Sequence, residues 1–201
     1  TGLDALPMGI NLWRAMLNWL GGLGIVIVAL IFLPVMKVGG MQFFRTEGFD
    51  TLGKVLPRAL DISKALLSIY LVMTLGCALA YRAFGMETFE AVIHALSALS
   101  TGGFSNRDTS FTEFPVPLHY VTVVALILST LPSIRPIPLF LGEVKPLWQD
   151  LQVRSYLRWT LYAIIMVLAW RVIRDAQPVC PALHQSVFNV VSIFSGTGLL
   201  S

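Results

Sequence analysis

The spacing of the charged residues constrains the fold of this chain more than any other feature of its sequence. No charged side chain occurs between Arg14 and Lys37, so residues 15–36 form one uncharged run. A helix of about 20 apolar residues crosses the hydrocarbon core of a bilayer, where a central charge costs about 2.5–3.5 kcal/mol. The chain as a whole is 56% apolar and 12% charged, whereas soluble domains carry about 25% charged residues. The sequence therefore predicts an all-α membrane protein and argues against a soluble domain.

Three further segments have the same character. Residues 65–81 and 114–134 lie between widely spaced charges. Residues 156–173 carry Arg158 and Arg171 near their two ends, where long basic side chains can reach the interface. Together with residues 15–36, these segments predict four membrane-spanning helices.

The basic residues are divided unevenly by these spans. If residues 15–36 run inward, nine of the 14 Lys and Arg residues fall on one side, in or near residues 37–60 and 142–154. Cytoplasmic loops carry an excess of basic residues, so both loops are predicted to be cytoplasmic. The count holds only if residues 86–106 enter and leave the membrane on the outer face.

Two apolar segments, residues 91–106 and 182–201, do not fit the spanning pattern. Each has a helix-like part too short to cross the membrane, followed by a tail of Ser, Thr and Gly. The two segments align at an offset of 95 residues, which pairs Ser100 with Ser195 and Gly103 with Gly198. Irregular backbone at membrane depth persists only where protein or a water-filled pathway satisfies its polar groups. The pattern predicts re-entrant pore helices that lead into the lining of a pathway.

The two tails have the chemistry of an ion filter. Neutral carbonyl oxygens can replace the hydration shell of an alkali cation without holding the ion too firmly, and glycine permits the backbone angles that this needs. The predicted filter residues are Ser100, Thr101, Gly102, Gly103, Ser195, Gly196, Thr197 and Gly198. The predicted supporting residues are Phe104 and Leu199, packed behind the strands, and the aligned pair His94 and Asn189.

Other interpretations of these segments stay open. A glycine pair after an apolar helix is also an ordinary helix end, and re-entrant segments that only pack would suit a membrane scaffold or interaction module. His94 could relay protons, since ionisable groups in membranes are functional candidates, although its alignment with Asn189 favours a hydrogen-bonding role. A membrane enzyme is the weakest alternative, because the sequence shows no nucleophile with a base and no metal-ligand spacing.

Several other residues have simple interpretations. Gly21, Gly22 and Gly24 would permit close helix packing, and Glu87 and Glu90 would favour the positive end of the short helix that they open. Asp108 could attract cations or lie in a solvated loop. No specific role is assigned to His119, to His184 or to residues 132–138.

These features divide the chain into parts of three repeats. The predicted parts are the end of a first repeat (1–36), a cytoplasmic loop (37–60), a complete second repeat (61–141, with pore helix 86–99 and filter 100–105), a second cytoplasmic loop (142–154) and the start of a third repeat (155–201, with pore helix 182–194 and filter 195–199).

Four stretches resemble the Trk-type potassium-uptake proteins, the TrkH, TrkG and KtrB group of the Trk/Ktr/HKT superfamily. They are GLDALP with LWRAMLNWLGGLGIVIVALIFLP, then VGGMQFFRTE, HALSALSTGGFSNRD and FNVVSIFSGTGLLS. The resemblance implies a potassium-channel-like transporter with four helix, pore-helix, filter, helix repeats around one ion path. About half of that architecture is present, and the chain is similar to an internal fragment.

The resemblance also implies substrate, location and partners. The substrate would be the potassium ion, with no cofactor in this chain. The protein would be a multi-pass homodimer in the inner (plasma) membrane, gated by a cytoplasmic nucleotide-binding regulatory subunit. Its further contacts would be the lipid bilayer and the remaining repeats, and no nucleic acid.

Overall fold

The computed structural model describes residues 2–3, 5–36, 59–130, 151–174 and 178–200, with side chains outside the description at 25–36, 59–63 and 65. The described elements are all helices, so the all-α prediction is confirmed. In chain order they are α1 (Met8–Met36), α4 (Ala59–Ala83), α5 (Thr88–Leu99), α6 (Val116–Thr130), α9 (Leu151–Arg174) and α10 (Val179–Phe194).

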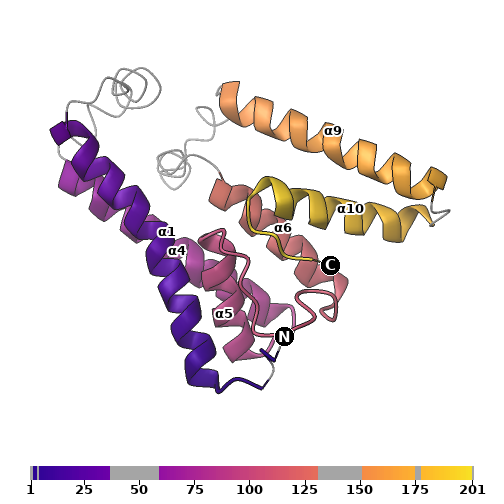
Figure 1. The fold of residues 1–201 in the computed structure, drawn as a ribbon, viewed down its shortest axis with the longest axis horizontal. Coiled ribbons are helices and arrows are strands. Elements are labelled where there is room, and N and C mark those ends of the chain that lie inside the picture. The colour runs from indigo at the N-terminus through magenta and orange to yellow at the C-terminus, as the bar shows by residue number, and fades with distance from the viewer. Residues whose placement is uncertain (1, 4, 37–58, 131–150, 175–177, 201) are drawn as a thin grey trace.

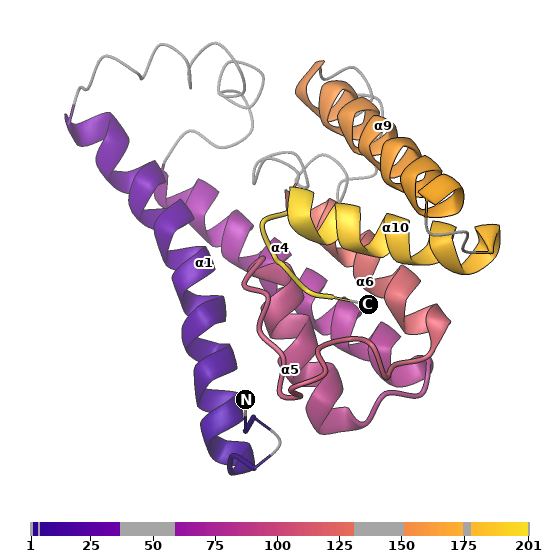
Figure 2. The same ribbon diagram turned by 45° about the vertical axis from the view of Figure 1, so that its right-hand side comes forward.

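Helices α5 and α10 each lie between neighbouring helices. Helix α5 packs against α1, α4 and α6, while α10 packs between α6 and α9 (Figures 1 and 2). Long helices α1 and α4 also contact each other, where Trp19 stacks on Tyr70 with ring centroids 5.0 Å apart and donates a hydrogen bond to Thr74 Oγ1 at 3.0 Å. The chain segment that follows α5 meets the segment that follows α10 at Gly103 and Thr197.

The helices differ in their capacity to span a membrane. Among the described residues, Leu66–Ala83 and Leu151–Arg174 are long and apolar enough to cross. Helix α1 has 29 residues, or about 40 Å at the ordinary rise of an α-helix. Helix α6 is apolar but has 15 residues, and the predicted span 114–134 continues outside the described part.

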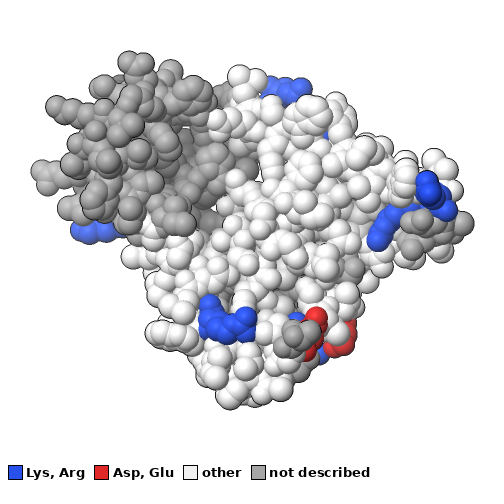
Figure 3. Space-filling model, in the orientation of Figure 1, with Lys and Arg blue, Asp and Glu red and all other residues white. Residues whose placement is uncertain are grey.

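Large apolar side chains are exposed on the outward faces of these helices. Leu75 on α4 is 62% exposed and Met166 on α9 is 70% exposed. Most of the described face in Figure 3 carries neither acidic nor basic side chains. An apolar exterior of this kind is suited to contact with lipid rather than water.

Three helix boundaries differ from the sequence prediction. Helix α5 begins at Thr88 instead of residue 86, and α10 begins at Val179 instead of residue 182. Pro181 lies in the first turn of α10, where a missing backbone N–H costs nothing. Helix α9 begins at Leu151, so the end of the loop predicted over 142–154 is helical and buries Val153. The rest of both predicted cytoplasmic loops, apart from residues 59–60 in α4, and residues 132–138 lie outside the described part.

One apolar cluster joins the second repeat to the start of the third. Its largest fully buried members are Tyr81 on α4, Phe111 in the loop between α5 and α6, and Phe188 on α10. Phe111 contacts Tyr81, with ring centroids 6.2 Å apart, and Phe188, at 5.5 Å. The loop that follows the first predicted filter segment is thus anchored in the same core as both pore helices.

Candidate ion filter

The C-terminus of α5 turns directly into the first predicted filter segment. Ser100 is the C-cap, and its N–H donates to Leu96 O at 3.3 Å. The next two backbone N–H groups turn back to the same helix end, with Thr101 N bonded to Ala98 O at 3.2 Å and Gly102 N to Ser97 O at 2.9 Å. The filter segment therefore starts from a helix end whose free carbonyls are partly satisfied by the segment itself.

The C-terminus of α10 repeats this arrangement 95 residues later. Ser195 N donates to Val191 O at 2.9 Å, Gly196 N to Ile193 O at 3.0 Å and Thr197 N to Ser192 O at 3.0 Å. The side chains agree as well, since Ser100 Oγ donates to Ser97 O and Ser195 Oγ donates to Ser192 O. The alignment deduced from sequence therefore corresponds to one local structure that occurs twice.

The backbone angle φ alternates between the left-handed and right-handed regions at equivalent positions of the two segments. Thr101 and Gly103 have φ of 52° and 67°, and their counterparts Gly196 and Gly198 have φ of 77° and 76°. Gly102 and Thr197, between them, are not in the left-handed region. Alternation of hand turns successive carbonyls to one side of the chain and successive N–H groups to the other, and glycine adopts the left-handed half at little cost.

The N–H groups and the carbonyls of these segments differ in their hydrogen bonding. On the N–H side, the groups named above donate to the pore helices, and Phe104 N donates to Ser97 Oγ at 2.5 Å. Within the described part of the chain, the carbonyls of residues 100–103 and 195–198 accept no hydrogen bond. These oxygens are therefore available to a ligand that accepts electron density, which is what a cation does.

One face of α1 lies along the first filter segment. The guanidinium of Arg14 lies 4.1 Å from the centroid of the Phe104 ring. A Cβ added to Gly102 would collide with the side chain of Asn18, and one added to Gly22 would lie 3.1 Å from Ser100 Cβ. Arg14, Asn18 and Gly22 thus meet Phe104, Gly102 and Ser100 in reverse order along the chain, so helix and segment run antiparallel.

Fewer of the α1 glycines have a close neighbour than the sequence predicts. A Cβ added to Gly21 or Gly24 would meet no described atom within 4 Å, so only Gly22 has the close neighbour predicted for all three. That neighbour is Ser100 of the filter segment and not another helix.

The two filter segments touch each other at Gly103. A Cβ added to Gly103 would fall on the carbonyl oxygen of Thr197. Since Ser100, Gly102 and Phe104 face α1, the alternate residue Gly103 faces the other segment. The Thr197 carbonyl is thereby directed toward the first segment.

The predicted supporting residues occupy different environments. Leu199 is buried in the apolar core, while Phe104 is partly exposed beneath Arg14. His94 is buried, and its Nδ1 lies 2.8 Å from Glu90 O and its Nε2 3.3 Å from Ser105 Oγ. Because a carbonyl only accepts, Nδ1 carries the proton and Nε2 accepts from Ser105. Asn189 is half-buried at the equivalent place on α10 and is also engaged in an interaction.

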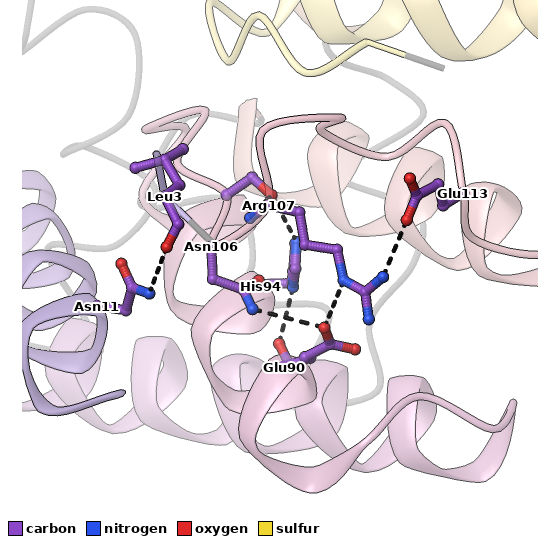
Figure 4. A network of polar contacts seen from close by, with 8 residues as sticks. Leu3, Asn11, Glu90, His94, Asn106, Arg107 and Glu113 are labelled. Carbon is purple, nitrogen blue, oxygen red and sulfur yellow. Dashed lines mark hydrogen bonds and ion pairs between the residues drawn. The ribbon is translucent and has the colours of Figure 1, made fainter. Parts of the chain in front are cut away.

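A polar network encloses the outer side of α5 (Figure 4). Arg107 Nε donates to Glu90 Oε1 at 2.6 Å and Arg107 Nη1 donates to Glu113 Oε2 at 3.0 Å. Asn106 Nδ2 also donates to Glu90 Oε1, at 3.5 Å. The bond to Glu90 raises the pKa of Arg107 above its ordinary value, so the guanidinium stays charged. Glu90 thus fixes the loop after the filter, besides any effect on the helix dipole.

Replacement of Glu90 by Gln is expected to destabilise the protein by about 1 kcal/mol, because Gln keeps an acceptor oxygen but removes the negative charge that strengthens the buried bond from Arg107. Glu87→Gln is the matched control, since Glu87 is exposed at the N-cap of the same helix and makes no capping bond. The measurement is the thermal unfolding midpoint of the purified protein in detergent. Equal midpoints for the two variants would contradict the role given to Glu90.

Some contacts near the filter were not anticipated from the sequence. His119 Nδ1 lies 3.0 Å from His184 Nε2, and the two rings stack with centroids 4.7 Å apart. His119 Nε2 lies 2.8 Å from Phe111 O. These contacts, which join α6, α10 and the loop between α5 and α6, give the two histidines a structural role that the sequence did not assign. The available signal was Phe111 itself, a large apolar residue within a polar loop.

Comparison with known proteins places this geometry in a family. Residues 1–134 match the family model described as TrkH, cation transport protein. The chain is 39% identical over 201 residues to the Trk system potassium uptake protein TrkI of Halomonas elongata, covering 99% of this chain and 41% of that protein. It is 34% identical over 205 residues to the Trk system potassium uptake protein TrkH of Escherichia coli K12, covering 98% and 42%.

A solved structure agrees with the sequence comparisons. The crystal structure of the potassium transporter TrkH from Vibrio parahaemolyticus superimposes with a TM-score of 0.82 and 30% identity, covering 96% of this chain and 39% of that one. The chain thus spans about two fifths of the length of the relatives that it matches. Because the family model matches more than half of the chain, the chain belongs to the TrkH cation transport protein family.

Proposed function

We propose that this chain lines part of a potassium path, with the ion coordinated by backbone carbonyls of Ser100, Thr101, Gly102, Gly103, Ser195, Gly196, Thr197 and Gly198. One observation carries the proposal. In both segments the N–H groups turn toward the pore helices, while the carbonyls accept no hydrogen bond from the described residues. A dehydrated cation needs such a set of neutral oxygens.

The pore helices add a favourable field. Both α5 and α10 point their C-terminal ends at the filter segments, and the C-terminus of a helix carries a partial negative charge of about half an electron. Described residues contain no group of three His, Cys, Asp or Glu side chains that could hold a metal. The proposed site attracts a cation through the dipoles of backbone carbonyls and helix ends, which suits passage rather than tight binding.

The ion and the setting of the path are proposed from the relatives and the charge pattern. K⁺ is the proposed substrate because the relatives are named as potassium uptake proteins. Membership of a family of transport proteins argues against the alternative of a membrane enzyme. The proposed location is the inner membrane, with residues 37–60 and 142–154 on the cytoplasmic side. A homodimer with a nucleotide-binding regulatory subunit is the proposed assembly, on the resemblance described above.

The test is the growth of a host that lacks its own potassium uptake and carries the complete gene product containing these residues. Gly198→Asp should abolish growth at low potassium and leave growth at high potassium intact, because a carboxylate in the filter holds the ion too firmly and displaces the carbonyls. Gly85→Asp is a matched control. Both glycines have left-handed φ, 76° and 95°, and a Cβ at either would meet nothing within 4 Å.

The control separates filter chemistry from backbone strain. Growth that is lost with Gly198→Asp and kept with Gly85→Asp, at equal amounts of protein in the membrane, supports the filter. Growth that is unaffected by either change would reject it and favour a membrane scaffold whose re-entrant segments only pack.

A further inference from the structure

The loop after the first filter segment contacts the lead-in to α1. Gly2 N donates to Asp108 Oδ2 at 2.6 Å, and Leu3 N donates to Asp108 Oδ1 at 3.2 Å. Leu3 O in turn accepts from Asn11 Nδ2 on α1 at 3.3 Å. Asp108 therefore connects the loop to the helix whose face lies along filter residues 100–104.

The same loop contacts the chain just beyond the second filter segment. Leu200 N donates to Ser110 Oγ at 3.2 Å, and Phe111 N donates to Leu200 O at 3.0 Å. Ser110 has a left-handed φ of 57°, which costs a residue with a Cβ about 1–2 kcal/mol. This strained conformation presents the hydroxyl to Leu200, two residues after Gly198.

The loop between these two contacts is held rigidly at both ends. Arg107 is bonded to Glu90 on α5 and to Glu113, and Phe111 is fully buried between the pore helices. Phe111 O is fixed as well, since it lies 2.8 Å from His119 Nε2. Residues 107–111 thus form a short, anchored bridge with two hydrogen bonds to the lead-in of α1 and two to Leu200.

We propose that residues 107–111 are a clasp that sets the spacing between the two filter segments, with Asp108 and Ser110 as positioning residues for ion selectivity. The inference rests on the proposed filter. Gly103 faces the Thr197 carbonyl directly, so a small relative movement of the two segments changes the distances between their oxygens. Selection between cations of different size depends on the geometry and field of those oxygens.

The experiment measures relative uptake of K⁺, Rb⁺ and Na⁺ by the complete gene product in proteoliposomes. The double variant Asp108→Ala with Ser110→Ala removes the side-chain bonds to Gly2, Leu3 and Leu200 and keeps the backbone bond from Phe111 N to Leu200 O. We expect the K⁺ to Na⁺ ratio to change by roughly three- to tenfold, the range that loss of an ordinary hydrogen bond produces. Asp108→Asn keeps one acceptor oxygen and should change the ratio less.

Thr109→Ala is the control within the same loop. Thr109 is exposed, and its side chain makes no hydrogen bond within the described part of the chain. Its ion ratio should equal that of the unaltered protein. A purely structural role for Asp108 and Ser110 would lower the uptake of all three ions in proportion to the amount of folded protein and leave their ratio unchanged.

Two results separate the clasp from the filter. An unchanged ion ratio in the double variant, together with loss of uptake in Gly198→Asp, overturns the clasp and leaves the filter standing. Uptake that survives Gly198→Asp rejects the filter, and with it the basis of the clasp. A changed ratio in the double variant, with Thr109→Ala unaltered, supports both.

Discussion

Gly103→Ala is expected to reduce the initial rate of potassium uptake by roughly five- to a hundredfold, because overpacking of this size costs about 1–3 kcal/mol and each factor of ten corresponds to about 1.4 kcal/mol. The added Cβ would fall on the carbonyl oxygen of Thr197. One of the two filter segments must move, and an oxygen proposed to coordinate the ion moves with it. The measurement is uptake by the complete gene product, normalised to the amount of protein in the membrane.

Gly85→Ala isolates the contribution of the backbone. Gly85 also has a left-handed φ, of 95°, and a Cβ there would meet no atom within 4 Å. This variant has a comparable conformational cost without the collision, so its uptake should stay close to that of the unaltered protein. Equal uptake by the two alanine variants would remove the evidence that the segments touch at Gly103.

Phe111→Ala is expected to destabilise the protein by about 3–5 kcal/mol, the usual cost of emptying a fully buried aromatic site. The Phe111 ring is in contact with the rings of Tyr81, His94, Phe114 and Phe188. Its removal opens a cavity between the two pore helices. The thermal midpoint of the protein in detergent should fall well below that of the unaltered protein.

Phe84→Ala serves as the comparison for this change. Phe84 is 54% exposed, and its removal leaves no enclosed cavity, so a small shift is expected. Phe111→Leu should lie between the two, because it keeps most of the buried volume. A Phe111→Ala midpoint equal to that of Phe84→Ala would show that the aromatic cluster does not hold the pore helices together.

Features that depend on neighbours along the chain are the ones that the sequence predicts best. A run such as residues 65–81 can avoid a large transfer cost only as a helix in lipid, and α4 covers it. The offset of 95 residues pairs Ser100 with Ser195, and the same turn occurs at both places. Helix ends were less certain, since α9 begins at Leu151, inside a loop predicted from charge alone.

Contacts between segments that lie far apart in the sequence could not be predicted in this way. Helical spacing puts Arg14, Asn18 and Gly22 on one face of α1, but nothing in that spacing says that the face lies along residues 100–104. His119 and His184 are separated by 65 residues, and no sequence pattern links them. Packing of α6 on α10 brings their rings within hydrogen-bonding distance.

The sequence by itself determined that this chain is helical and apolar, that it contains a repeated Ser, Thr and Gly segment, and which residues form that segment. These properties follow from transfer energies and from the backbone freedom of glycine, which depend on neighbours along the chain. Only the tertiary structure decided which way each part of the segment faces. Gly103 meets Thr197 and Ser110 meets Leu200 because α5, α6 and α10 pack around Phe111, and such packing depends on the fit of side chains far apart in sequence.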